Sequence, residues 1–169
     1  MSHYGLQKAK VKGFKAVPLP AFLEGPARMM GYVDTDTARE MFNNVKKTDI
    51  YDSKLGMYKT SASIEECSME NGRCRAFTPG WQERENVFLH MEYKYMLAMI
   101  KAGLYDEFYE TVTRALVPFL DPNMYGRSIL ENSSFIASSA NPNEDIHGRG
   151  FVARLSGSTT EMISMWIEM

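Results

Sequence analysis

The end of the sequence has the start signals of a helix and none of the usual stop signals. Ser158 and Glu161 form a capping box, and an apolar run follows them as far as Met169. No Gly, Asn or Pro closes the run, and an apolar helix that finishes on Trp166 and Ile167 has nothing after it to pack against. We therefore expect the 169 residues to be part of a larger protein, truncated at the C-terminus.

Composition and charge restrict the functional class. A content of 44% hydrophobic and 24% charged residues is ordinary for a globular domain, and a net charge of −2 gives no electrostatic reason to expect nucleic acid. No apolar run approaches the roughly 20 residues that a membrane span needs, and residues 1–15 lack a signal-peptide core. Cys67 and Cys74 fit no C-x-x-C spacing and are more easily read as free thiols than as one small disulfide. We expect a soluble, cytoplasmic protein without a membrane partner.

Helical periodicity is confined to three regions. Residues 1–36 show no sustained period and are expected to form an extended connector. Residues 37–47 read as a short helix with a capping box of Thr37 and Glu40 and one apolar face. Residues 83–120 read as two helices, because Gly103 ends the first stripe and a second begins at about Tyr105. The third region is the final helix.

The segment between the hairpin and the final helix has the composition of a loop. Residues 121–154 are rich in Ser, Asn, Pro and Gly with short apolar runs, so we expect a long ordered loop system. A helix, a helical hairpin and a last helix joined in this way are typical of an α/α barrel or a helical repeat. Since no self-similar period is present, the barrel is preferred, and residues 37–169 are expected to form part of it with little strand content.

The start of the final helix is a candidate anion site. The stretch from Ser156 to Thr160 offers free backbone N–H groups, the positive end of the helix dipole and several hydroxyls. The alternative is that Ser and Thr at a helix start are simple caps.

His90 lies seven residues after Glu83, which on one continuous helix returns to nearly the same face. An imidazole and a carboxylate could then flank one pocket, although a half-buried histidine bonded to a neighbour is the simpler interpretation. A metal site is disfavoured, because His90 and Glu92 do not make an H-E-x-x-H motif and His147 is isolated.

Two further residues are candidates for binding a sugar or phosphate. Arg149 lies between Gly148 and Gly150, where the backbone can approach a ligand and a guanidinium can bind oxyanions; a solvated glycine-rich turn is the alternative. Trp81 is the aromatic residue best suited to stack on a sugar ring, since most others have helical spacing and are expected in the core.

The order of these pieces resembles a known family. Three segments carry the resemblance: Thr78-Pro79-Gly80-Trp81-Gln82-Glu83, then Phe88-Leu89-His90, then Leu155-Ser156-Gly157-Ser158-Thr159. Together they resemble the C-terminal part of the catalytic domain of inverting glycoside phosphorylases of glycoside hydrolase family 94, which act on cellobiose, chitobiose and β-glucans. The resemblance spans roughly residues 70–169, and residues 125–133 and 147–151 are similar to the relatives that act on long chains.

The resemblance implies a partial (α/α)6 barrel that binds a β-glucoside or β-oligoglucan together with inorganic phosphate as co-substrate and no other cofactor. Phosphate attacks the anomeric carbon while an aspartic acid protonates the leaving oxygen, which yields an α-sugar 1-phosphate. The matching positions imply that His90, Ser158 and Thr159 contact phosphate. Trp81, Glu83 and Arg149 are the residues expected to bind the sugar.

The chain departs from the family in two respects. Cellobiose-type members usually carry threonine at the position of Ser158, and the general-acid aspartate of the family lies upstream, in a part of the barrel that this chain does not contain. We therefore assign no catalytic residue; Asp121 and Asp145 are candidates by residue type alone. The remainder of the barrel is an expected partner, and a homodimer of the full protein stays open. A non-catalytic carbohydrate-binding fragment or a helical scaffold fragment is the alternative.

Overall fold

The computed structural model describes residues 3–153 and 156–169 and shows a mixed α and β fold in which helices predominate. The α-helices of the described residues are α1 (Glu24–Met29), α2 (Thr35–Lys46), α3 (Leu89–Lys101), α4 (Tyr105–Ala115), α5 (Pro122–Tyr125) and α6 (Ser156–Glu168). The strands are β1 (Tyr51–Asp52), β2 (Met57–Tyr58), β3 (Val87–Phe88), β4 (Ser133–Ile136) and β5 (Gly150–Ala153). Arg154, at the end of the predicted loop system, and Leu155, in the third family segment, lie outside the described residues, as do Met1 and Ser2 of the predicted connector.

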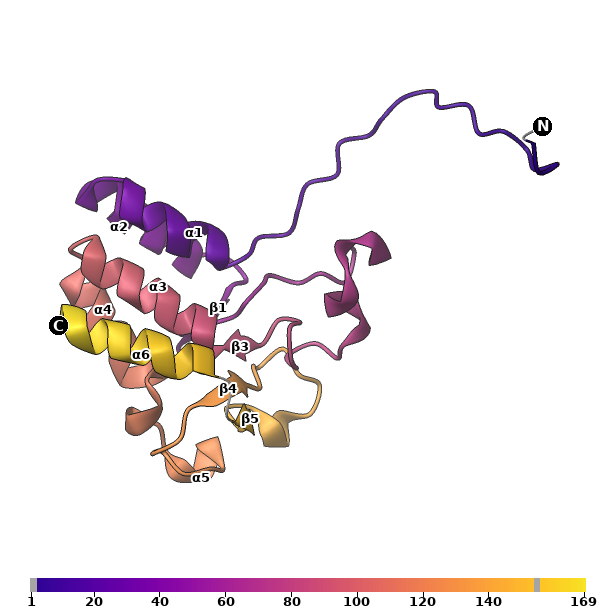
Figure 1. Cartoon of the computed structure of the whole chain (residues 1–169). Helices are drawn as coiled ribbons and strands as arrows, with labels where there is room; N and C mark the ends of the chain where they lie inside the picture. Colours follow the sequence, from indigo (N-terminus) through magenta and orange to yellow (C-terminus); the bar gives the residue numbers. More distant parts are fainter. Residues whose placement is uncertain (1–2, 154–155) are drawn as a thin grey trace.

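Helix α3 is the centre of the molecule, with α1 on one side and α6 on another (Figure 1). The predicted hairpin of α3 and α4 is confirmed, and Gly103 ends α3 as expected. Its positive φ of 77° allows the chain to reverse, and the N–H of Leu104 then donates to the carbonyl of Met99 at 2.9 Å. Helix α3 is packed against α1, α4 and α6, and these contacts hold its first residues in place.

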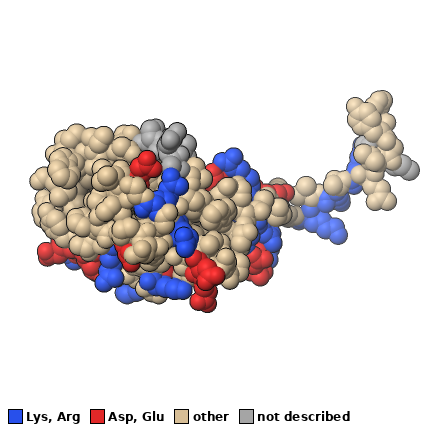
Figure 2. Space-filling view, turned by 90° about the horizontal axis from the view of Figure 1, so that it is seen from below, with Lys and Arg blue, Asp and Glu red and all other residues tan. Residues whose placement is uncertain are grey.

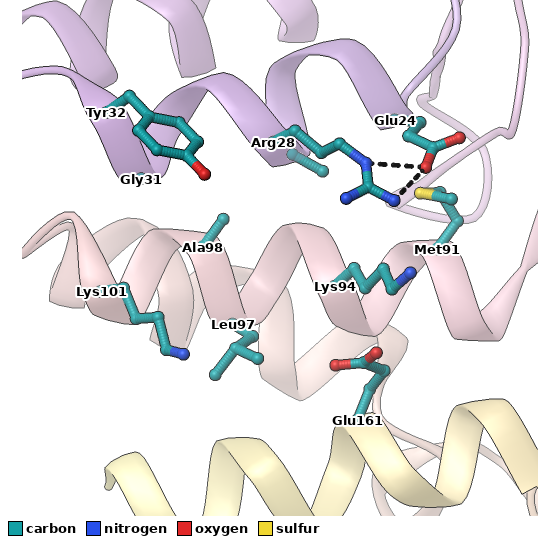
Figure 3. A pocket seen from close by; sticks show the side chains of 11 residues that line it. Glu24, Arg28, Gly31, Tyr32, Met91, Lys94, Leu97, Ala98, Lys101 and Glu161 are labelled. Carbon is teal, nitrogen blue, oxygen red and sulfur yellow. Dashed lines mark hydrogen bonds and ion pairs between the residues drawn. The ribbon is translucent and has the colours of Figure 1, made fainter.

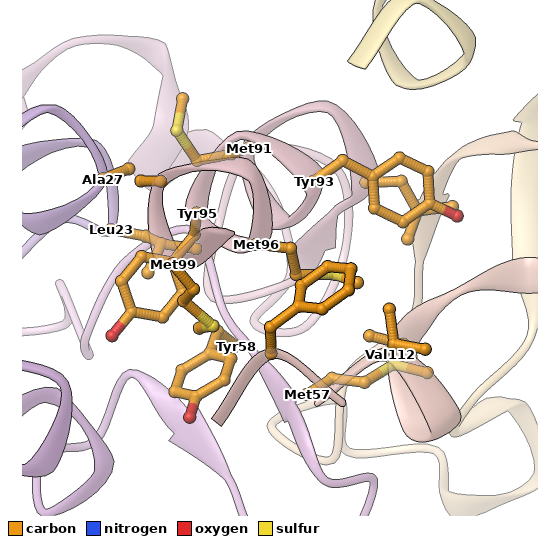
Figure 4. Close-up of a cluster of buried hydrophobic side chains, with 14 of the residues drawn as sticks. Leu23, Ala27, Met57, Tyr58, Met91, Tyr93, Tyr95, Met96, Met99 and Val112 are labelled. Atoms are coloured by element: carbon orange, nitrogen blue, oxygen red, sulfur yellow. The ribbon is translucent and has the colours of Figure 1, made fainter. Parts of the chain in front are cut away.

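Apolar and aromatic side chains of α3 form the core (Figure 4). Tyr93, Tyr95, Met96 and Met99 are fully buried, and they meet residues from β2 and α4 such as Val112. A helix buried on most of its surface cannot rotate or shift without opening this core. The position of the first residues of α3 is therefore fixed.

Helix α2 confirms the predicted helix but not its predicted cap. Its apolar face buries Ala38, Phe42 and Val45. The N-cap is Asp34, whose carboxylate accepts a hydrogen bond from the N–H of Thr37 at 2.9 Å, so the predicted Thr37 capping box is wrong. This bond lowers the pKa of Asp34, because it stabilises the charged form.

The segment predicted as a connector is extended only in part. Residues 6–21 have no regular structure and project from the body, and basic side chains, all of them lysines in this segment, are visible along the arm in Figure 2. Residues 24–29 instead form α1, because Leu23, Ala27 and Met30 make a short apolar stripe that is buried in the core. Pro26 does not prevent this helix, since it lies in the first turn, where its missing N–H is not needed.

A small antiparallel sheet lies beside the start of α3, in the order β3-β4-β5. Phe88 pairs with Phe135, and Phe135 pairs with Phe151, so three phenylalanines stand in one row across the strands. Strands β4 and β5 lie within the segment predicted as loops. Strand β3 leads directly into α3 and therefore couples the sheet to the residues at the start of that helix.

Candidate anion site at the start of the last helix

His90 lies against the first turn of α6. A Cβ atom placed on Gly157 would be only 2.6 Å from Nδ1 and 2.8 Å from Cγ of the His90 ring, so the absence of a side chain at Gly157 permits the contact. The structure thus brings together two predicted features, His90 and the small-residue helix start, that are far apart in the sequence. In general, the first turn of an α-helix carries N–H groups without an acceptor inside the helix and the positive end of the helix dipole.

The His90 ring is held by two further neighbours. Its Nε2 lies 3.3 Å from Oε1 of Glu161, and the two side chains are 31% and 15% exposed. Phe88 packs edge-on to the ring, with centroids 5.6 Å apart and planes at 87°. His90 therefore fits the simpler interpretation, a half-buried histidine that is hydrogen-bonded to a neighbour. It also lies at the helix start where an anion would bind.

Ser158 is placed inside α6 and not at its cap. The helix begins at Ser156, and the buried hydroxyl of Ser158 donates to the carbonyl of Ser133 in β4 at 3.3 Å. The predicted capping box of Ser158 and Glu161 is therefore wrong, because each side chain bonds to a different element. Thr159 is exposed, and its hydroxyl accepts from Nδ2 of Asn132 at 3.5 Å. Of the two predicted phosphate-binding hydroxyls, only that of Thr159 is on the surface.

Trp81 stacks on Phe151, with ring centroids 3.7 Å apart and planes at 2°. Phe151 is followed by Phe135 at 5.4 Å, and Phe135 by Phe88 at 4.8 Å. With the Phe88 and His90 contact, the rings form an unbroken aromatic row from Trp81 to His90. Sequence reasoning missed this row, because it depends on strand pairing between distant segments.

Glu83 and Arg149 are not joined to His90 by any contact among the described residues. Helix α3 begins at Leu89, so the predicted continuous helix from Glu83 to His90 is wrong, and the carboxylate of Glu83 accepts from Nε of Arg73 at 2.9 Å. Arg149 is exposed, and its Nε donates to the carbonyl of Asp145 at 3.1 Å. The arrangement of Arg149 matches the alternative of a solvated glycine-rich turn.

A cleft of about 420 Å³ lies between α1, α3 and α6 (Figure 3). Its apolar floor includes Leu97 and Ala98, and Glu161 stands at one wall. Lys94 lines the same cleft one helical turn after His90, and it forms no hydrogen bond or ion pair with the described residues. Glu161 therefore contacts His90 and shares a cleft with a basic side chain.

Asp121 and Asp145, the candidates for a general acid by residue type alone, both lie in short turns near the surface. The carboxylate of Asp121 caps α5 by accepting from the N–H of Asn123 at 2.9 Å, and Asp145 is exposed in a short 3-10 turn. Within residues 3–153 and 156–169, no three metal-binding side chains of the His, Cys, Asp or Glu type converge. In the same residues, no helix has the length and apolar character needed to cross a membrane.

Comparison with known proteins does not assign the chain to a family, because no protein-family model and no curated protein matches it.

Proposed function

We propose that this chain is part of an inverting glycoside phosphorylase of the family 94 type and contributes the phosphate-binding side of its site. The contact of the His90 ring with Gly157 at the start of α6 carries the proposal. A helix start supplies N–H donors and a positive dipole, and the adjacent imidazole adds a ring nitrogen, outside the helix, that can accept the O–H of hydrogen phosphate. The two features that the family resemblance assigns to phosphate are neighbours in space.

In the proposed reaction, an oxygen of phosphate forms a bond to the anomeric carbon of a β-linked glucoside as the glycosidic bond breaks. A general acid from another part of the enzyme gives its proton to the leaving oxygen, and the product is an α-sugar 1-phosphate of inverted configuration. His90 and the first turn of α6 hold the phosphate on the attacking side. Phosphate is the nucleophile, so no base is needed to activate water.

Trp81 and His90 lie at opposite ends of the aromatic row, separated by Phe151, Phe135 and Phe88. Phe151 covers the face of the Trp81 ring that is turned toward this row, so the proposal assigns Trp81 to a sugar unit of the β-oligoglucan other than the one that reacts with phosphate. In this proposal α3, α4 and α6 are helices of a partial (α/α)6 barrel. The remainder of the barrel supplies the general acid, and the reaction takes place in the cytoplasm.

A thermal melt with and without millimolar phosphate tests the proposal, because a ligand that binds only the folded state raises the midpoint. We expect a shift in the wild-type chain, and His90→Ala should weaken phosphate binding by about 1–3 kcal/mol. His147→Ala is the matched control, since this half-buried histidine also has polar partners, Lys54 and the carbonyl of Asn141, but lies outside the site.

Three outcomes separate the candidate functions. A phosphate-dependent shift that His90→Ala removes and His147→Ala keeps supports the phosphorylase fragment. Binding of a β-oligoglucan without any effect of phosphate favours a non-catalytic carbohydrate-binding fragment. A melt that responds to neither ligand refutes the proposed site and favours a helical scaffold.

A further inference from the structure

Glu161 and Gly157 are one helical turn apart on α6, and both face His90. Gly157 lies against Nδ1 of the ring, and Oε1 of Glu161 lies 3.3 Å from the other ring nitrogen, Nε2. Two successive turns of one helix therefore contact the two nitrogens of the imidazole. Neither the helical pattern nor the family segments indicated this role for Glu161.

The contact has a defined direction. A carboxylate has only acceptor oxygens, so the hydrogen bond requires the proton on Nε2 of His90. In the neutral ring this leaves Nδ1 without a proton, facing the first turn of α6. The contact with Glu161 therefore favours the Nε2–H tautomer and restrains the plane of the ring.

The surroundings of Glu161 offer it little other support. Its side chain is 15% exposed, and among the described residues its hydrogen bond is to His90. Lys94 lines the same cleft and extends above Glu161 in Figure 3, but no ion pair joins them. A carboxylate that is mostly removed from water needs such a partner, which favours a persistent contact with His90.

We infer that Glu161 is a positioning residue for His90: it fixes the Nε2–H tautomer and holds the ring against Gly157, so that His90 is already oriented when an anion reaches the start of α6. For phosphate, this inference rests on the proposed function. Glu161 does not itself bind the anion. Without it, the ring must be ordered during binding, and the affinity falls.

Three variants test this role. Glu161→Met keeps the length of the side chain but has no acceptor, Glu161→Gln keeps an acceptor oxygen, and Glu168→Gln is the control. Glu168 also lies on α6 and pairs with α3, through Lys101 at 3.4 Å, but away from His90. The readouts are the ¹⁵N shifts of the His90 ring at about pH 8.5, well above the ordinary histidine pKa, and the phosphate Kd.

We expect the Nε2–H signature in wild type, Glu161→Gln and Glu168→Gln, and a mixture of tautomers in Glu161→Met. The phosphate Kd should rise about tenfold in Glu161→Met, a typical effect for a residue that orients a ligand-binding histidine, and stay within about twofold in the other two.

A wild-type ¹⁵N spectrum in Glu161→Met overturns the inference whether or not phosphate binds, because the spectrum is recorded without ligand. An unchanged Kd in Glu161→Met overturns the role in phosphate binding. If no variant and no wild-type sample binds phosphate while Glu161→Met still changes the tautomer, the proposed function fails and the positioning of His90 stands.

Discussion

The indole of Trp81 and the phenyl ring of Phe151 are parallel, 3.7 Å apart at their centroids. Such a pair contributes beyond the area that it buries, so the two residues should be energetically coupled. A double-mutant cycle of Trp81→Ala and Phe151→Ala, followed by urea unfolding, should give a coupling free energy of about 0.5–1.5 kcal/mol.

The other tryptophan provides the control for this cycle. Trp166 is 77% exposed on α6, and no ring contact joins it to Phe151 among the described residues. A cycle of Trp166→Ala with Phe151→Ala should therefore be additive within about 0.5 kcal/mol. Equal coupling in both cycles would show that the stacked geometry contributes nothing specific.

The elements that could be predicted from the sequence are those whose signals are local. The apolar face of α2 repeats with the helical period within its own residues, and Gly103 marks the end of α3 because few other residues adopt its positive φ. The hairpin follows from that stop and from the second stripe. None of these signals requires knowledge of what the helix packs against.

The parts that could not be predicted depend on partners far along the chain. Phe135 pairs with Phe88 on one side and Phe151 on the other, and each strand is too short to show a period of its own. Strand β3 is also the reason why Glu83 and His90 do not share a helix. The sequence singled out His90 and the start of α6 separately, and the structure places them in contact. The partner of Glu161 could not be predicted, because the Ser158 and Glu161 pattern fits a helix cap as well as a tertiary contact.

Glu92 should make stability depend on pH. Its Oε2 accepts from the N–H of Tyr58 at 3.0 Å, Oε1 has no partner among the described residues, and complete burial raises the pKa well above the ordinary 4.5. The folded state therefore favours the protonated acid. Its stability contribution is complete below about pH 4.5 and is lost as the pH rises through the folded pKa.

Glu92→Gln should remove this dependence. The free energy of unfolding of the variant should exceed that of wild type by an amount that grows above pH 4.5, by up to about 1.4 kcal/mol per pH unit. Urea unfolding at several pH values measures the difference. Glu40→Gln, at an exposed position, is the control and should run parallel to wild type. A constant offset between Glu92→Gln and wild type would contradict the expected protonation.

Asp52 joins β1 to the loop after β4. Its buried carboxylate accepts from the N–H and the hydroxyl of Ser139, both at 2.7 Å, and from the N–H of Lys54 at 3.1 Å. Asp52→Asn replaces one acceptor oxygen by a donor that faces another donor, so it should destabilise the protein by about 1–3 kcal/mol. Asp106→Asn, on the exposed side of α4, should stay within about 0.5 kcal/mol of wild type in the same thermal or urea measurement.

Gly157→Ala is the most direct test of the contact between α6 and His90. The added Cβ would lie 2.6 Å from Nδ1, closer than atoms pack, so either the ring or the helix must move. Gly→Ala within a helix usually stabilises a protein. Gly25→Ala is the control, because no atom lies within 4 Å of the new Cβ in α1, and it should raise the free energy of unfolding by about 0.4–1 kcal/mol.

At Gly157 the sign should reverse, with a loss of about 1–3 kcal/mol, because overpacking outweighs the gain in helix propensity. The phosphate-induced shift of the melting midpoint should shrink in Gly157→Ala and remain in Gly25→Ala, since only the first substitution displaces His90. If Gly157→Ala stabilises the chain as Gly25→Ala does, the ring does not rest on the first turn of α6, and the anion site loses the observation that carries it.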